Sequence, residues 1–148
     1  MRKFGLALGV LAFLGTGALF LEGQKSPNTQ TLHARLGGEV FVYDVADTYL
    51  LREQGLSGRD QLDPGSGMIF VFPKDDQYGF WMKDMRFSID IIWLDSRYRI
   101  VDVKKDATPA SYPEIFSPSQ SARYVAEVRA GFFEERHLKI GDTLEILR

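Results

Sequence analysis

Three apolar blocks separated by short polar turns lie in the middle of the chain, between Gly67 and Asp95. They are residues 68–72, 78–82 and 89–94. Short apolar runs rich in β-branched and aromatic side chains are typical of strands. The last block is apolar at nearly every position. It therefore predicts a strand that is buried on both of its faces.

Further strands are predicted on both sides of these blocks. Residues 32–36 alternate apolar and polar positions, and the Gly37-Gly38 pair indicates a turn into a second strand over residues 40–45. Similar short segments follow the central blocks at residues 99–104, 122–128 and 143–147. The pattern predicts about eight short strands in total.

One short helix is predicted between the second and third strands. Thr48 or Asp47 is suited to the N-cap position, and Gly55 is placed like the glycine that ends a helix. So short a helix must dock to be stable, and its leucines are expected to face the sheet. These leucines are Leu50, Leu51 and Leu56. Residues 130–138 predict a second short helix or a turn.

A long loop follows over residues 106–121, with three prolines. Loops of this length in a small domain are usually functional or disordered, and the apolar Tyr112, Ile115 and Phe116 indicate that this one packs on the domain. Regular turns without an alternation of strands and helices predict a mainly β fold. We expect a compact antiparallel sandwich or barrel with one or two short helices.

The N-terminus predicts an apolar helix that precedes the domain. Arg2 and Lys3 are followed by an uncharged run over residues 4–21, which is long enough to span a bilayer and has no clear cleavage site. The pattern indicates a signal anchor, with a cleaved signal peptide as the alternative. Residues 22–31 are polar and predict a flexible tether, and residues 32–148 predict a single β domain.

This topology places the domain outside the inner or plasma membrane, in the periplasm or at the cell surface. Arg2 and Lys3 are expected to stay on the cytoplasmic side. A cleaved signal would instead release a secreted protein.

Composition limits the partners and the kinds of site that this chain is expected to have. The chain carries a net charge of −2, and Arg2 and Lys3 both precede the domain, so the remainder carries −4. That acidity argues against a nucleic-acid partner. There is no cysteine, and the two histidines, His33 and His137, lie far apart in the sequence. We predict neither a metal site nor a cofactor.

Several stretches of this chain resemble a widespread bacterial and archaeal family that is catalogued as domain of unknown function 192. The matching stretches are residues 45–48, 54–59, 67–73, 80–84, 89–95 and 122–128, followed by Gly131 and the closing Gly141-Asp142 pair. The likeness extends over about residues 36 to 147. It implies a compact, mainly β fold and no particular reaction.

The chain departs from the family pattern at three places. Asp84-Met85 stands where the family tends to have Asn-Thr, and Leu51 stands where an acid usually caps the helix. The proline-containing loop often carries cysteines in relatives and has none here.

Polar and amphipathic residues within the matching stretches are the candidate ligand-binding residues. They are Arg59, Trp81, Lys83, Asp84, Asp90 and Arg123. In a pocket, Trp81 would offer a stacking face, the cations would bind an anion, and Asp90 would orient a hydroxyl or a cation. The alternative is structural: Asp90 accepts from backbone amides or pairs with an arginine, and Trp81 lies in the core.

Three hypotheses follow for the function. The first is a membrane-tethered extracytoplasmic domain that binds a small polar or carbohydrate-like ligand or an envelope protein. The second is a hydrolase that uses Asp84 and Asp90, which requires both acids in one cleft. The third is a structural component of an envelope complex. No catalytic motif surrounds either histidine, so the sequence favours binding over catalysis.

Overall fold

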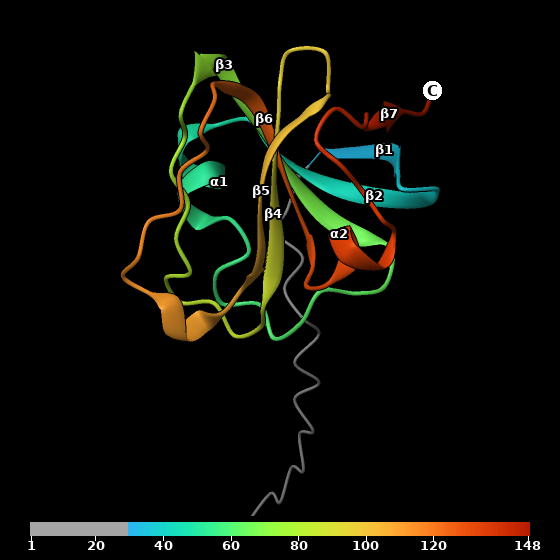
Figure 1. The fold of residues 1–148 in the computed structure, drawn as a ribbon. Helices are drawn as coiled ribbons and strands as arrows, with labels where there is room; N and C mark the ends of the chain where they lie inside the picture. Colours follow the sequence, from blue (N-terminus) through green and yellow to red (C-terminus); the bar gives the residue numbers. More distant parts are fainter. Residues whose placement is uncertain (1–29) are drawn as a thin grey trace, which may run out of the picture.

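Seven strands form one curled sheet in the computed structural model, which describes residues 30–148 (Figure 1). The strands are β1 (Thr31–Leu36), β2 (Glu39–Ala46), β3 (Ser66–Asp76), β4 (Ile89–Leu94), β5 (Ile100–Ala107), β6 (Ala122–Arg129) and β7 (Glu145–Ile146). The helices are α1 (Tyr49–Gln54), α2 (Phe132–Glu135) and the 3-10 turn η1 (Pro109–Ser111). The predicted mainly β class with short helices is confirmed.

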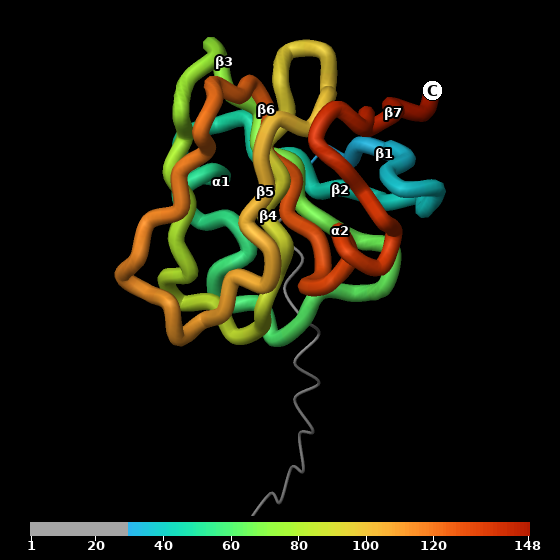
Figure 2. The backbone as a smooth tube through the Cα atoms, viewed as in Figure 1, coloured from blue at the N-terminus to red at the C-terminus, as the bar shows by residue number. Residues whose placement is uncertain are grey.

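The sheet curls until its two ends approach each other. Its order is β5-β4-β6-β3-β2-β1-β7. A bridge joins Arg99 to Thr143, and the Ile100 amide donates to the Asp142 carbonyl at 2.8 Å, which links the two ends. Figure 2 follows this curl along the backbone. The prediction left a sandwich or a barrel open, and the structure has a single curled sheet.

The prediction of a purely antiparallel sheet was wrong at one pair of strands. β2 and β3 are parallel, while every other neighbouring pair is antiparallel. A parallel pair needs a crossover connection, and here α1 with the loop over residues 55–65 supplies it. The predicted lack of a regular alternation of strands and helices holds, but it did not reveal this single strand-helix-strand unit, whose helix is only six residues long.

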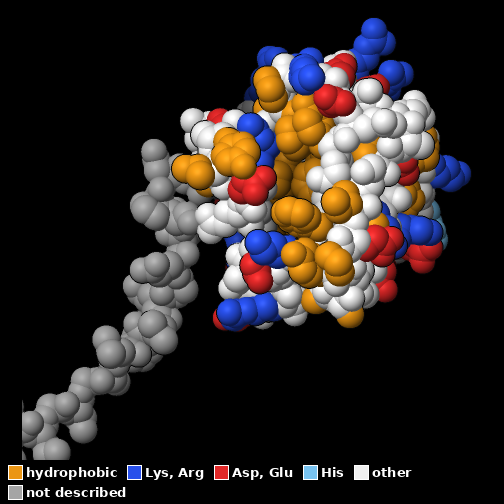
Figure 3. All heavy atoms as spheres, turned by 90° about the vertical axis from the view of Figure 1, so that its left-hand side faces the viewer, with side chains coloured by type: hydrophobic (Ala, Val, Ile, Leu, Met, Phe, Trp, Pro, Cys, Tyr) orange, Lys and Arg blue, Asp and Glu red, His pale blue; other side chains and the backbone are white. Residues whose placement is uncertain are grey.

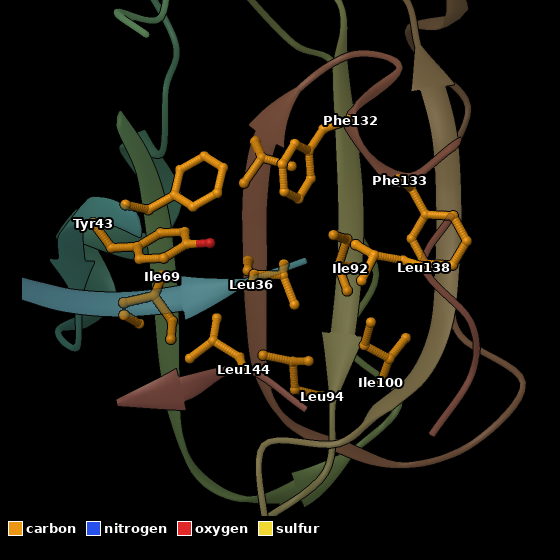
Figure 4. Packing of buried hydrophobic residues seen from close by; sticks show 14 residues of the cluster. Leu36, Tyr43, Ile69, Ile92, Leu94, Ile100, Phe132, Phe133, Leu138 and Leu144 are labelled. Atoms are coloured by element: carbon orange, nitrogen blue, oxygen red, sulfur yellow. The ribbon is translucent and has the colours of Figure 1, made fainter. Parts of the chain in front are cut away.

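Both faces are buried at the centre of the sheet, whereas the outer side of β1 and of the first part of β2 is exposed. Inside the curl lies an inner core that includes Phe41, Ile92, Leu94 and Phe132 (Figure 4). On the other face lies an outer core that includes Met68, Phe70, Ile91, Trp93 and Val125. All six residues of β4 are buried, so the predicted double burial of this strand is confirmed. Side chains that alternate along β4 enter the two cores in turn.

The block at residues 78–82 was predicted as a strand and is not one. It makes only an isolated bridge, in which Phe80 and Phe116 exchange two backbone hydrogen bonds of 2.8 Å each. The reason is topological: β6 pairs with both β3 and β4 and so occupies the place between them. The block is apolar because Phe80 packs against the outer core.

Helix α1 has the predicted caps. The Thr48 hydroxyl accepts from the Leu51 amide at 3.2 Å, and Gly55 ends the helix with a φ of 51°. Leu56 is buried and Leu51 packs against the outer core, as predicted. Leu50 was expected to face the sheet, but 76% of it is exposed. The helix presents the side of Leu51 and Arg52 to the sheet, and this turns Leu50 toward solvent.

The long loop after β5 packs on the domain, as its apolar residues predicted. Phe116 is buried in the outer core, with the Lys104 ammonium 4.5 Å from its ring centroid. The Asp102 carboxylate accepts from both the amide and the hydroxyl of Ser119, at 2.7 and 2.8 Å. These contacts hold the loop against the outer face of the sheet.

The predicted N-terminal helix and most of the predicted tether lie outside the described residues. Within residues 30–148, no helix combines the length and the apolar character that a membrane span requires.

Candidate functional site

A groove of about 580 Å³ opens on the outer face of the sheet, between α1 and the segment that follows β3. Figure 3 looks at the side of the domain that carries α1 and shows hydrophobic side chains gathered around a hollow. This volume lies within the usual range of about 300–1,000 Å³ for small-molecule sites.

The groove has two walls and a floor. The first wall is α1 with the residues after it, including Tyr49, Arg52, Glu53 and Leu56. The second wall is largely aromatic, and it comes from β3 and from the loops around residues 78–85 and 115. The residues of this second wall are Phe72, Pro73, Lys74, Tyr78, Phe80, Trp81, Met85 and Ile115. Phe70 and Glu127 also line the groove.

The aromatic wall is a packed cluster with fixed geometry. Phe72 and Tyr78 stack with centroids 3.5 Å apart, and the edge of Phe80 meets Phe70 at 4.8 Å. The Trp93 indole nitrogen donates to the Tyr78 carbonyl at 2.9 Å. Because Trp93 belongs to the buried strand β4, this bond ties the wall to the centre of the sheet. The rings are therefore positioned before any ligand arrives.

The helical wall is held by Arg52. Its guanidinium donates to the Val71 carbonyl at 2.8 Å and to the Asp47 carbonyl at 2.7 Å. The same guanidinium lies 5.2 Å from the centroid of the Phe72 ring. Arg52 thus fixes α1 to β3, and its donors are directed at the backbone.

Glu127 lies at the bottom of the groove, in the middle of β6. Its register neighbours are Met68 on β3 and Ile91 on β4, both members of the outer core. Only 5% of Glu127 is exposed. In the described part of the chain, its Oε2 atom has no hydrogen-bond partner. A buried carboxyl oxygen without a partner is costly, since buried polar groups are normally paired.

Burial changes the protonation of this carboxyl. Desolvation raises the pKa of Glu127 to about 8, and the positive charge of Arg59 opposes that rise. Burial disfavours the charged form of an acid because the interior solvates the charge poorly. At pH 7 the carboxyl of Glu127 is therefore mostly protonated, whereas an ordinary glutamate is ionised.

Arg59 lies near this floor, since its charge acts on Glu127. Its guanidinium forms an ion pair with the Asp44 carboxylate at 2.8 Å. Asp44 pairs in register with Met68, which in turn pairs with Glu127, so the two acids lie two strands apart on the same face. Arg59 also borders a small hollow of about 20 Å³, which shares Gly55 with the groove.

The structure places the six predicted site residues in different surroundings. Trp81 is the one that lines the groove, with 45% of it exposed, and Arg59 lies near the floor. Lys83 and Asp84 are exposed in the turn after the aromatic wall. Their backbone carbonyls accept from the Ser57 hydroxyl and the Gly58 amide, both at 2.9 Å.

The other two predicted residues lie away from the groove. Asp90 is buried and accepts from the backbone amides of Asp106, Gly131 and Phe133, which is the structural arrangement considered for it. Arg123 forms an ion pair with Asp75 at 2.6 Å. Neither residue, nor Asp84, lines the groove.

Glu127 is the residue that sequence reasoning missed. Arg123, Val125 and Glu127 alternate with Tyr124 and Ala126, and a mixed charged and apolar row of this kind is typical of a solvent face. The signal that could have identified Glu127 as buried lies in the two neighbouring strands. The adjoining strands β3 and β4 both carry long apolar runs, so a strand between them is covered on both faces.

Comparison with known proteins identifies the family. The model of DUF192, described as "Uncharacterized ACR", matches residues 32–146. The UPF0127 protein of Thermococcus gammatolerans is 34% identical over 103 residues, which is 68% of this chain and 63% of that protein. The UPF0127 protein PYRAB11210 of Pyrococcus abyssi is 32% identical over 107 residues, with 69% and 83% covered.

Solved structures show the same fold. A protein of Sinorhizobium meliloti 1021, described as a candidate transcription regulator, superimposes with a TM-score of 0.74 and 27% identity over 84% of this chain and 98% of its own. A protein of unknown function from Novosphingobium aromaticivorans DSM 12444 gives 0.71 and 25%, over 79% and 84%. The resemblance in the sequence motifs is thus confirmed, and this chain belongs to the uncharacterised DUF192 family, together with the UPF0127 proteins.

Proposed function

We propose that this domain binds a small organic ligand in the groove between α1 and the aromatic wall. The observation that carries the proposal is Glu127, which lines this groove and has a buried carboxyl oxygen without a partner from the described residues. Binding sites combine mostly apolar walls with a few polar groups that orient the ligand. The aromatic wall supplies the first part of this combination and Glu127 the second.

The aromatic rings of the wall indicate which shape of ligand fits the groove. Tyr78, Phe80 and Trp81 offer faces and edges to a flat ring, as either an aromatic group or the apolar side of a sugar requires. Binding accounts for the groove better than hydrolysis by Asp84 and Asp90, since neither acid lines it.

A protein partner is the second candidate function. Three apolar residues at the groove are largely exposed: Tyr49 at 69%, Ile115 at 59% and Trp81 at 45%. Exposed apolar side chains that gather on one surface mark interaction sites. An envelope protein that inserts one side chain into the groove would cover all three.

In the same proposal, residues 4–21 tether the domain to the inner or plasma membrane, with the domain on the outer side. Support comes from the uncharged apolar run after Arg2 and Lys3. Fusion of residues 1–30 to a reporter that is active only outside the cytoplasm is expected to give activity in the membrane fraction. An inactive fusion in the soluble fraction would overturn the tether.

The binding function is tested by unfolding the full chain in a non-ionic detergent with a library of small molecules. The library contains sugars, nucleosides, aromatic acids and aromatic amines. A ligand present at 100 times its dissociation constant stabilises the folded state by about 2.7 kcal/mol, which raises the melting temperature by several degrees.

Two neighbouring residues of α1 offer a matched pair of variants. Tyr49 lines the groove and Leu50 does not, and both side chains are largely exposed. Tyr49→Ala is expected to weaken binding of a library hit about fivefold, since one stacking contact contributes about 1 kcal/mol. Leu50→Ala is expected to leave that affinity unchanged. Equal losses in both variants, or no hit in the whole library, would count against a ligand in the groove.

A further inference from the structure

We infer that the groove selects organic cations, namely ligands in which an aromatic or other apolar ring carries a primary or secondary ammonium group that reaches Glu127. The inference rests on the proposed binding function and names the chemical class of the ligand.

The first argument is the unmet hydrogen-bonding capacity of Glu127. The residue lines the groove, and its buried Oε2 atom has no donor among the described residues. The neighbours of Glu127 across the sheet, Met68 and Ile91, carry no hydrogen-bond donor in their side chains. A ligand in the groove that Glu127 lines can supply the missing donor. An ammonium group supplies up to three donors and a positive charge, and hydrogen bonds between ionised partners are about twice as strong as neutral ones.

The second argument is the aromatic lining. The face of an aromatic ring carries partial negative charge, so rings such as Phe72, Phe80 and Trp81 attract a cation that lies close to them. A carboxylate at the floor with aromatic rings along the wall suits an ammonium group. The same combination is poor for an anion, because the ring faces repel it and Glu127 repels it whenever its carboxyl is ionised.

The charged side chains around the groove do not reverse this preference. Arg59, the cation whose charge acts on Glu127, is paired with Asp44 at 2.8 Å. At the rim, the Lys74 ammonium lies 3.2 Å from the Asp76 carboxylate. Arg52 keeps its positive charge, but its Nη1 atom donates to two backbone carbonyls, which fixes the guanidinium against β3. Glu53 adds a negative charge on the same side of the groove.

The protonation state of Glu127 gives the inference a measurable consequence, namely a dependence of ligand affinity on pH. In the free protein its carboxyl is mostly protonated at pH 7, because burial raises its pKa to about 8. An ammonium ligand keeps its own proton up to about pH 10, as a lysine side chain does. When it binds, the Glu127 carboxyl loses its proton to the buffer and forms an ion pair with the ligand. Affinity must then rise with pH until Glu127 is already ionised in the free protein.

The test compares tryptamine with tryptophol, which have the same indole and the same two-carbon linker but end in an ammonium group and a hydroxyl. Each compound is titrated calorimetrically into the full chain in non-ionic detergent, at pH 6, 7 and 8. Titrations in phosphate and in Tris, which differ in ionisation enthalpy, give the number of protons released. Injections into detergent alone are subtracted.

Three results are expected together. Tryptamine releases close to one proton at pH 7, and tryptophol releases none. The affinity ratio of tryptamine to tryptophol rises roughly tenfold from pH 6 to pH 7 and about fivefold from pH 7 to pH 8, where Glu127 of the free protein is already partly ionised. In Glu127→Gln, a substitution close in size that cannot ionise, tryptamine loses both its proton release and its advantage over tryptophol.

The two ways of failing are distinguishable. If tryptophol binds as well as tryptamine at every pH, the groove binds neutral ligands, which overturns the cation inference and leaves the proposed binding function standing. If neither compound nor any member of the library binds, both proposals fall. Proton release that persists in Glu127→Gln would also overturn the inference, since another group would then be its source.

Discussion

Glu127→Gln is expected to stabilise the domain at pH 8 and to leave its stability almost unchanged at pH 4. The folded state holds the Glu127 proton up to about pH 8, whereas the unfolded chain releases it near 4.5. Between these values the folded state binds more protons than the unfolded state. The wild-type free energy of unfolding therefore falls as pH rises through this window, and it levels off above it.

The stabilisation by Glu127→Gln has an upper limit. The pKa of Glu127 is 4.5 in the unfolded chain and about 8 in the folded state. This difference corresponds to at most roughly 5 kcal/mol in the free energy of unfolding, because each pKa unit is worth about 1.4 kcal/mol. Glutamine removes this loss because it stays neutral in both states. We expect the melting temperature of the variant to exceed that of the wild type by about 10 °C at pH 8. Thermal unfolding from pH 4 to pH 9 measures the difference.

The matched control is Glu53→Gln, which removes one negative charge at the exposed rim of the same groove. If this control changed the pH dependence as much as Glu127→Gln, loss of overall negative charge would explain the result. A Glu127→Gln variant with the same pH dependence as the wild type would show that Glu127 is ionised and solvated in the folded protein.

Asp90→Ala is expected to cost the domain about 3–5 kcal/mol of stability at pH 7. The Asp90 carboxylate accepts from three backbone amides, those of Asp106 at 2.9 Å, Gly131 at 3.2 Å and Phe133 at 2.8 Å. It thereby joins β4 to the end of β5 and to the start of α2. Alanine leaves these donors without their acceptor, and the bond from the Phe133 amide is buried from solvent. Urea unfolding, followed by tryptophan fluorescence, gives the difference in free energy.

Asp95→Ala is the matched control, since it also removes a carboxylate that accepts from backbone amides. Asp95 binds the amides of Arg97 and Arg99 at 2.8 and 3.0 Å, but its side chain is accessible to solvent and water can replace it. This variant is expected to lose about 1 kcal/mol. Equal losses in the two variants would indicate that burial contributes nothing to the role of Asp90.

The periodicity of the sequence determined the local structure well. The apolar runs predicted β3 and β4, and the continuous character of residues 89–94 predicted burial on both faces. Thr48 and Gly55 marked the ends of α1. These features depend on residues that are close in sequence, through capping bonds and side-chain alternation. They can therefore be predicted without knowledge of the tertiary fold.

Strand order was decided only by the tertiary structure. β6 lies between β3 and β4 although it follows both in the sequence. This insertion excluded residues 78–82 from the sheet and made them the wall of a groove. Pairing across such distances depends on loop closure and packing of the whole domain, and no local pattern records it.

The candidate site shows the same division. Trp81 could be found from the sequence, because an aromatic residue beside charged neighbours stands out. Asp90 stood out for its apolar neighbours, and the structure gives it three amide partners away from the groove. Glu127 looked like a solvent-facing residue until the fold placed Met68 and Ile91 on either side of it. By itself the sequence determined which residues form strands; the tertiary structure decided which acid is buried without a partner, because burial depends on neighbours that are distant in sequence.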